Sequence, residues 1–118
     1  MTEIIVLGSG TFQPELTRHC SSYLFKIGKE KIVFDFGRGA IDGLLKLKVN
    51  LFDIDKIFIT HFHADHFSEL SSLLHWIFSA PKLEKLYNFP ITTIYGPRGL
   101  KKSLEHLLNA FGKSIYKN

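Results

Sequence analysis

The sequence predicts an α/β fold in which helices cover a sheet that begins with antiparallel strands. The chain opens with β-rich segments, continues with alternating strand and helix patterns, and keeps its strands apolar at most positions. Apolar strands of this kind are typical of a sheet that is covered by helices. The chain has 118 residues and no repeat, low-complexity tract or linker, so residues 1–118 are interpreted as a single domain.

The N-terminal third is predicted to hold three strands. The apolar run Ile4–Leu7 forms the first strand, which ends in a glycine-containing loop over residues 8–19. The β-rich segments Ser21–Ile27 and Lys31–Phe36 flank a Gly-Lys-Glu turn, and this arrangement is a hairpin signal.

Strand and helix patterns alternate along the rest of the chain. Residues 40–48 have apolar side chains at helical spacing, and a short strand follows over Lys56–Thr60. A second amphipathic helix is expected over residues 67–79. A strand over Ile91–Tyr95 and a third helix over residues 100–111 complete the predicted order.

Composition excludes several classes of protein. Hydrophobic residues make up 45% and charged residues 22% of the chain, which is too apolar for a disordered protein. No stretch approaches the roughly 20 apolar residues that span a bilayer, and Ile4–Leu7 is too short for the apolar part of a signal peptide, so no membrane association is expected. The single cysteine, Cys20, cannot form an internal disulfide, and we therefore expect a reducing, cytoplasmic compartment.

The positive charge is concentrated near the C-terminus. The formal net charge is +4, and residues 81–118 hold seven basic and two acidic side chains, whereas residues 1–80 hold eight basic and nine acidic ones. A basic C-terminal third can attract an anionic partner such as RNA, or it can be a solvated helix face.

Three of the six histidines lie in the segment His61-Phe62-His63-Ala64-Asp65-His66, between a predicted strand and a predicted helix. His and Asp side chains are costly to bury unpaired, and a surface loop has no need for four of them in six residues. In an extended turn, His61 and His63 point the same way and can offer ring nitrogens to one metal ion. Asp65 and His66 can face a second position. Imidazole and carboxylate ligands suit Zn²⁺, with Mn²⁺ or Fe as alternatives.

This segment matches the His-x-His-x-Asp-His signature of the metallo-β-lactamase fold superfamily. Other segments resemble its ribonuclease Z-like members: Leu7–Thr11 with Pro14 and Arg18, Phe34–Gly39, and Ile94–Leu100. The resemblance runs from residue 4 to about residue 111 and implies the N-terminal half of an αββα sandwich. The chain departs from this group at Arg38 and at Ala40–Ile41, where its members typically have Glu and Thr-Gln.

The resemblance also implies roles for individual residues. His61 and His63 would ligate one divalent ion, and Asp65 and His66 would ligate a second. Asp65 would in addition orient or deprotonate the attacking water. Asp35, at the end of a predicted strand, would support the metal-binding loop, and its alternative role is to cap the turn after it. The implied reaction is hydrolysis of a phosphodiester by a metal-bound hydroxide, with RNA such as a tRNA precursor as the substrate.

These four side chains do not complete a two-metal site. The superfamily adds another His, a bridging Asp and a final His from later in a longer chain, and residues 116–118 hold no candidate ligand. The sequence is therefore interpreted as half of the architecture, which would leave an apolar face exposed, as is typical of a partner surface. The chain would then be part of a longer product, pair with a second polypeptide or a second copy, or be a remnant that binds metal weakly.

Three functions follow from these observations. The first is a metal-dependent hydrolase that cleaves RNA or another phosphodiester. The second is a non-catalytic metal-binding or assembly fragment, which the missing ligands favour. The third is the same fold acting on another ester, such as a cyclic nucleotide, a sulfate ester or a lactone. The basic C-terminal third favours a polyanionic substrate over those of the third group.

Overall fold

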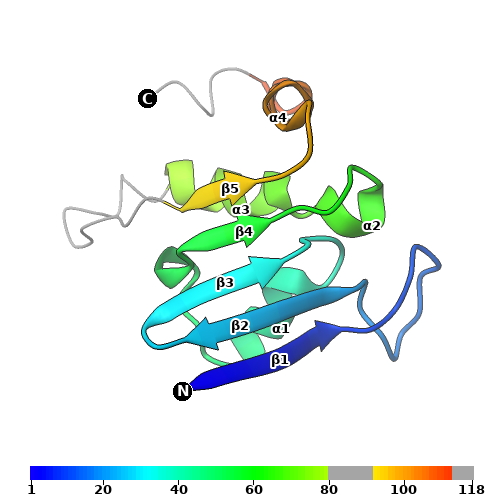
Figure 1. Cartoon of the computed structure of the whole chain (residues 1–118). Coiled ribbons are helices and arrows are strands. Elements are labelled where there is room, and N and C mark those ends of the chain that lie inside the picture. The colour runs from blue at the N-terminus through cyan, green and yellow to red at the C-terminus, as the bar shows by residue number, and fades with distance from the viewer. Residues whose placement is uncertain (80–91, 113–118) are drawn as a thin grey trace.

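A five-stranded mixed sheet forms the centre of the structure (Figure 1). The computed structural model describes residues 1–79 and 92–112. The strands lie in the order of the sequence: β1 (Thr2–Gly8), β2 (Ser22–Ile27), β3 (Glu30–Phe34), β4 (Lys56–Phe58) and β5 (Thr93–Tyr95). Strands β1, β2 and β3 pair antiparallel, and β4 and β5 continue the sheet parallel to β3. The predicted sheet with an antiparallel beginning is confirmed.

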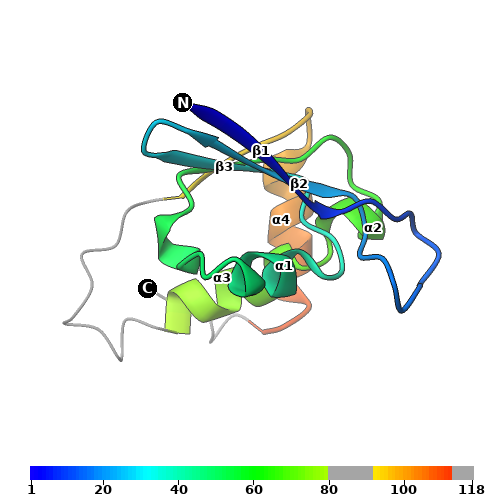
Figure 2. The same ribbon diagram turned by 90° about the horizontal axis from the view of Figure 1, so that it is seen from below.

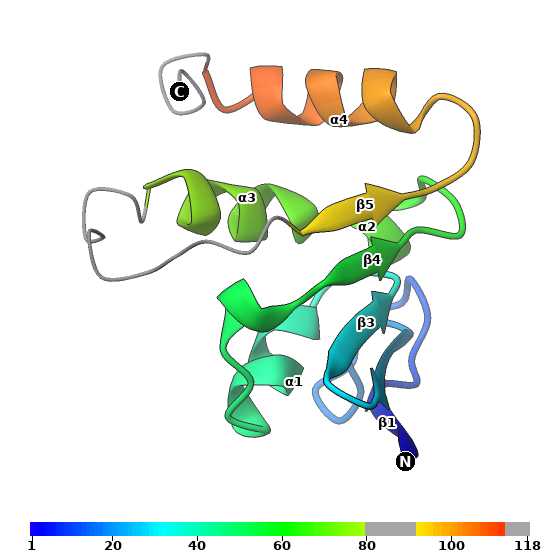
Figure 3. The same ribbon diagram turned by 60° about the vertical axis from the view of Figure 1, so that its left-hand side comes forward.

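Helices cover one face and one edge of this sheet. The helical elements are α1 (Ala40–Lys46), the 3₁₀ turn η1 (Leu51–Asp53), α2 (Ala64–Phe67), α3 (Leu70–Ser79) and α4 (Leu100–Asn109). Figure 2 shows α1 and α3 on the same side of the sheet. Figure 3 shows α4 beside β5, at the edge opposite to β1.

The predicted helix over residues 67–79 is wrong in its start and its continuity. The chain is helical from Ala64, and the helix is interrupted before α3 begins at Leu70. The interruption arises because the Glu69 amide donates to the Phe36 carbonyl, 3.0 Å away on another segment, so it is not available for a bond one turn back. Asp65 and His66 lie on α2, within the early part of this helical region.

Two of the predicted strands are shorter than expected at their C-terminal ends. Strand β3 ends at Phe34 because Asp35 has a left-handed backbone with φ 62°, which turns the chain out of the sheet. Strand β4 ends at Phe58. The predicted start of the last strand, Ile91, lies outside the described residues.

Alternation along the strands divides the sheet into a buried face and an open face. Leu24, Val33 and Ile57 are register partners on neighbouring strands, and each is fully buried against the helices. Burial of each of these side chains stabilises the fold by about 1.5–3 kcal/mol. Ile94 extends this row onto β5, where α4 packs against the same core through Leu100, Leu104 and Leu107.

The open face carries a row of aromatic side chains. The row is made by register partners on four strands: Tyr23, Phe34, Phe58 and Tyr95. The Phe34 and Phe58 rings stack with 5.1 Å between centroids, and Phe58 and Tyr95 stack at 4.8 Å. Ile4 and Val6 continue this surface on β1 and are more than half exposed. The half-sandwich interpretation predicts an uncovered apolar face of this kind.

Among the described residues, no helix combines the length and the apolar character that crossing a bilayer requires.

Candidate metal centre

The candidate metal ligands gather where the parallel strands end. Asp35 directly follows β3, and Thr60 and His61 come shortly after β4, which is its parallel neighbour. Because the carboxyl ends of parallel strands meet at one edge of a sheet, residues that are 25 or more positions apart become neighbours there. The Asp35 amide donates to the Phe58 carbonyl, 2.8 Å away, and this bond holds the two strand ends together.

Three of the predicted ligands form one cluster. His61, His63 and Asp65 each offer a ligand atom, and these atoms all lie within 4.8 Å of one another. The His61 and His63 rings meet edge to face with 4.7 Å between their centroids. His63 is exposed, while His61 and Asp65 are half-buried, so the cluster opens to solvent on the His63 side. Two imidazoles and a carboxylate are a donor set that zinc, manganese and iron accept.

His66, the fourth predicted ligand, lies beside this cluster. Its ring centroid is 4.0 Å from that of His61, and its Nε2 is 3.0 Å from Oδ2 of Asp65. Two atoms that each lie about 2 Å from the same ion are about 3 Å apart, so the spacing of these two atoms fits a shared ion. The structure therefore brings all four predicted ligands together, and the donors present fit a divalent metal.

Asp35 connects the strand end to two of the histidines. Its buried carboxylate accepts hydrogen bonds from the Thr60 amide (2.8 Å) and the Thr60 hydroxyl (2.9 and 3.0 Å). Nδ1 of His66 lies 2.8 Å from Oδ2 of Asp35, and Nδ1 of His61 lies 3.0 Å from the Thr60 hydroxyl. When each Nδ1 carries the proton, each Nε2 keeps its lone pair for a metal ion.

Close packing holds the loop after β3 against the ligand segment. A Cβ atom at Gly37 would lie 1.8 Å from the Asp65 carbonyl oxygen, so only glycine fits there. The Phe36 amide donates to the His66 carbonyl at 2.8 Å. The backbone of Asp65 and His66 is thus fixed by residues from the other strand end.

Glu69 is a supporting residue that the sequence analysis missed. Its carboxylate accepts from the Gly39 amide (2.6 Å) and the Ile41 amide (3.0 Å), at the start of α1. These amides have no partner within the helix, so Glu69 acts as a cap supplied from a distant segment. No local pattern could reveal this role, because the partners are 28 and 30 positions away.

We expect Glu69→Ala to lower the free energy of unfolding by about 1–2 kcal/mol, because two helix-start amides lose their charged acceptor. Urea unfolding followed by circular dichroism measures this change. Glu105→Ala, which removes an exposed carboxylate from α4, is the control and should change the value by less than about 0.5 kcal/mol. An equal effect of the two substitutions would show that the Glu69 cap does not stabilise the fold.

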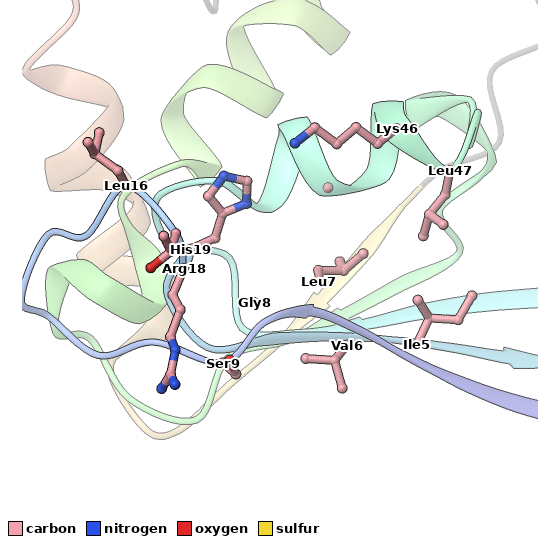
Figure 4. Close-up of a pocket in the computed structure, with 12 residues that line it drawn as sticks. Ile5, Val6, Leu7, Gly8, Ser9, Leu16, Arg18, His19, Lys46 and Leu47 are labelled. Atoms are coloured by element: carbon pink, nitrogen blue, oxygen red, sulfur yellow. The ribbon is translucent and has the colours of Figure 1, made fainter.

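The other described histidines lie away from the ligand cluster. His75 is exposed on α3 and His106 is exposed on α4. His19, which the sequence placed in a loop, lines a separate pocket of about 420 Å³ between β1 and α1. In Figure 4 the His19 and Lys46 side chains lie on the α1 side of this pocket, and Arg18 extends away from α1.

A second pocket, of about 480 Å³, opens beside the predicted ligands. His63 and Asp65 form part of its wall, and Phe12, Pro14 and Arg38 form another part. A substrate that reaches the cluster from this side therefore meets both the ligands and the loop over residues 11–20.

Comparison with known proteins places the chain in a family. The family model of the metallo-beta-lactamase superfamily matches residues 17–103. The chain belongs to this superfamily, as the ligand signature and the mixed sheet with its helices indicate.

Its similar relatives are ribonucleases Z. The chain is 36% identical over 110 residues to ribonuclease Z of Pyrococcus horikoshii and 33% identical over 105 residues to that of Methanosarcina mazei. The first match covers 93% of this chain and 34% of the relative, and the second covers 89% and 32%. The chain thus spans about a third of the length of these curated relatives.

Solved structures show the same likeness. The crystal structure of the short form of human tRNase Z matches with a TM-score of 0.75 and 35% identity, over 94% of this chain and 40% of that one. The long form from yeast matches with a TM-score of 0.72 over 98% of this chain and 17% of that one. At 24% identity, the second likeness shows the fold alone.

Proposed function

We propose that this chain provides the N-terminal half of a metal-dependent phosphodiesterase of the ribonuclease Z type, with RNA as its substrate. The observation that carries the proposal is the cluster of His61, His63 and Asp65 with His66 beside it, in a chain that is 36% identical to a ribonuclease Z. The buried, free thiol of Cys20 suits a reducing compartment, and we place the activity in the cytoplasm.

His61 and His63 would hold one divalent ion, and Asp65 and His66 a second. When bound, such ions lower the pKa of a water molecule and stabilise negative charge that develops at phosphorus. Zinc is the ion we propose, because the four donors are three imidazoles and one carboxylate, which it accepts in tetrahedral sites.

The chain's own residues prepare the site for this chemistry. Asp35 holds the His66 ring directly and the His61 ring through Thr60, and Nε2 of His66 lies 3.0 Å from Oδ2 of Asp65. Asp65 would orient the attacking water and accept its proton, and the position of its carboxylate within the cluster and in the pocket lining supports this role.

The test is hydrolysis of bis(p-nitrophenyl) phosphate and of a short RNA by the purified chain, alone and assembled with the half that completes the site, with added Zn²⁺ or Mn²⁺. The proposal predicts cleavage that EDTA abolishes and that added metal restores. Cleavage that persists in EDTA would contradict a metal-dependent mechanism. Cleavage of a sulfate ester or a lactone in preference to both phosphodiesters would favour the third candidate function.

A second candidate function is assembly, and the aromatic row on the open sheet face favours it. The chain spans about a third of the length of its relatives. An exposed, contiguous apolar face such as this one is typical of an interface. In this case the open face packs against a second β-sheet with an apolar face, which completes the sandwich. Sheets that pack in this way lie about 10 Å apart and interdigitate their side chains.

The same purified chain distinguishes the two candidates. Assembly without catalysis predicts less than one metal ion per chain, no chelator-sensitive cleavage, and a dimer or larger species in light scattering. Two metal ions per chain in a catalytically active monomer would contradict it.

A further inference from the structure

We propose that Arg38 and Phe12 form a nucleotide-binding subsite beside the metal centre, in which Arg38 binds a phosphate of the RNA and Phe12 stacks on a base. This inference rests on the proposed function and names how that site would hold its substrate. Both residues line the pocket that His63 and Asp65 also line.

The backbone of Arg38 is fixed from both sides. Its carbonyl accepts from the Cys20 amide at 3.1 Å, and the next amide, that of Gly39, donates to Glu69. The preceding residue, Gly37, packs directly on the Asp65 carbonyl. The backbone of Arg38 is therefore held in a fixed position relative to the segment of the predicted ligands, as a substrate-binding residue requires.

The guanidinium is oriented and still has hydrogen-bond donors to offer. Nη2 donates to the carbonyls of Arg18 (3.0 Å) and Glu15 (3.3 Å). Within the described part of the chain, Nε and Nη1 have no such acceptor, and the side chain is exposed. A planar, permanently charged group with free N–H donors suits the oxygens of a phosphate.

Charge favours an anion at this side chain. Arg38 is the one Lys or Arg residue among those that line the pocket, and its positive charge balances the carboxylate of Asp65 there. A phosphodiester that enters the pocket thus finds a cation in the same lining as the proposed ligands His63 and Asp65. Electrostatic attraction of this kind is strongest for a polyanion such as RNA.

Phe12 adds a surface for a base. Its side chain is 81% exposed on the same loop whose carbonyls hold Arg38. An exposed ring beside an arginine is the combination with which proteins bind single-stranded nucleic acid, because every base has a face that can stack on it. Ribonucleotides are therefore the ligand class, with one phosphate and one base per subsite.

The test is binding of a fluorescein-labelled 12-nucleotide oligouridylate by the whole chain in EDTA, followed by fluorescence anisotropy at several salt concentrations. We expect Arg38→Gln to weaken binding about tenfold and to reduce the slope of log K against log salt by about 0.7. We expect Phe12→Ala to weaken binding about tenfold with no change in slope, because stacking involves no counterion release.

Matched controls separate these effects from general ones. Lys29→Gln removes the same charge from the exposed β2–β3 turn, and Leu16→Ala removes an exposed apolar side chain from the same loop as Phe12. Both should bind as the wild type does. Arg38→Lys keeps the charge and should keep the salt slope. If Arg38→Lys loses the slope as Arg38→Gln does, Arg38 only holds the loop, and the proposal is overturned.

Failure of this subsite and failure of the proposed function give different results. A wild-type chain that shows chelator-sensitive cleavage but whose oligouridylate binding is absent or unaffected by both substitutions would overturn the subsite alone. A chain that binds the oligonucleotide with the expected losses in Arg38→Gln and Phe12→Ala, yet cleaves no phosphodiester even when assembled with the half that completes the site, would support the subsite and contradict the hydrolase.

Discussion

Replacing Asp65 with Ala is expected to lower the kcat of phosphodiester cleavage by about 10³-fold, because it would remove both a proposed metal ligand and the group proposed to accept the proton of the attacking water. The carboxylate belongs to the ligand cluster and lies 3.0 Å from Nε2 of His66. The backbone carbonyl that packs on Gly37 is unchanged in this variant. The free energy of unfolding should therefore change by no more than about 1 kcal/mol.

Initial rates in the active protein, measured with saturating metal and with RNA as the substrate, check this expectation. The matched control is Asp53→Ala, which removes an exposed carboxylate at the end of η1 and should leave the rate unchanged. Wild-type turnover by the Asp65 variant would exclude the role assigned to this carboxylate. Unfolding measured on the same samples separates loss of chemistry from loss of structure.

The second large effect is expected for Asp35→Asn, which should weaken metal binding by 10- to 100-fold, the range that is typical when a group that orients metal ligands is lost. The carboxylate accepts from Thr60 and from His66, and an amide has only one oxygen with which to serve both. Asn tolerates the left-handed backbone of this position, so the substitution adds little backbone strain. Stability should fall by about 1–3 kcal/mol.

Competition with a chromophoric chelator measures the metal affinity, and urea unfolding measures the stability. Asp55→Asn is a closely matched control, because Asp55, directly before β4, also accepts a backbone hydrogen bond, from Lys31 at 2.8 Å. This control should lose stability and keep its metal affinity. If both variants bind metal as the wild type does, Asp35 is a structural turn residue, which is its alternative role.

The ligand segment could be identified from the sequence because its information is local. Four residues of the types that bind metals lie within six positions. Neither a hydrophobic core nor a solvated loop has a structural need for such a cluster of His and Asp side chains. The sequence also indicated a role for Asp35, through its resemblance to a known segment at a strand end. The structure adds the contacts by which Asp35 acts, on Thr60 and on His66.

Thr60, Glu69 and Arg38 could not be assigned in this way. Each acts on a partner far along the chain: Thr60 on Asp35, Glu69 on Gly39, and Arg38 on the carbonyl of Arg18. Hydroxyl, carboxylate and guanidinium groups are common on protein surfaces, so only their partners distinguish them. The break between α2 and α3 escaped prediction for the same reason, because a carbonyl 33 positions earlier, that of Phe36, captures the Glu69 amide.

The sequence by itself determined the order of strands and helices, the buried row that alternates along the strands, and the residue types of a metal site, because these depend on side-chain periodicity and on local composition. Only the tertiary structure decided which side chains hold the predicted ligands in place and which residues line the pocket beside them. Parallel pairing of β3 with β4 brings Asp35 beside Thr60 and His66. The loop over residues 11–20 and the loop after β3 bring Phe12 and Arg38 to the same pocket. Such contacts depend on strand pairing between distant segments, which no local pattern specifies.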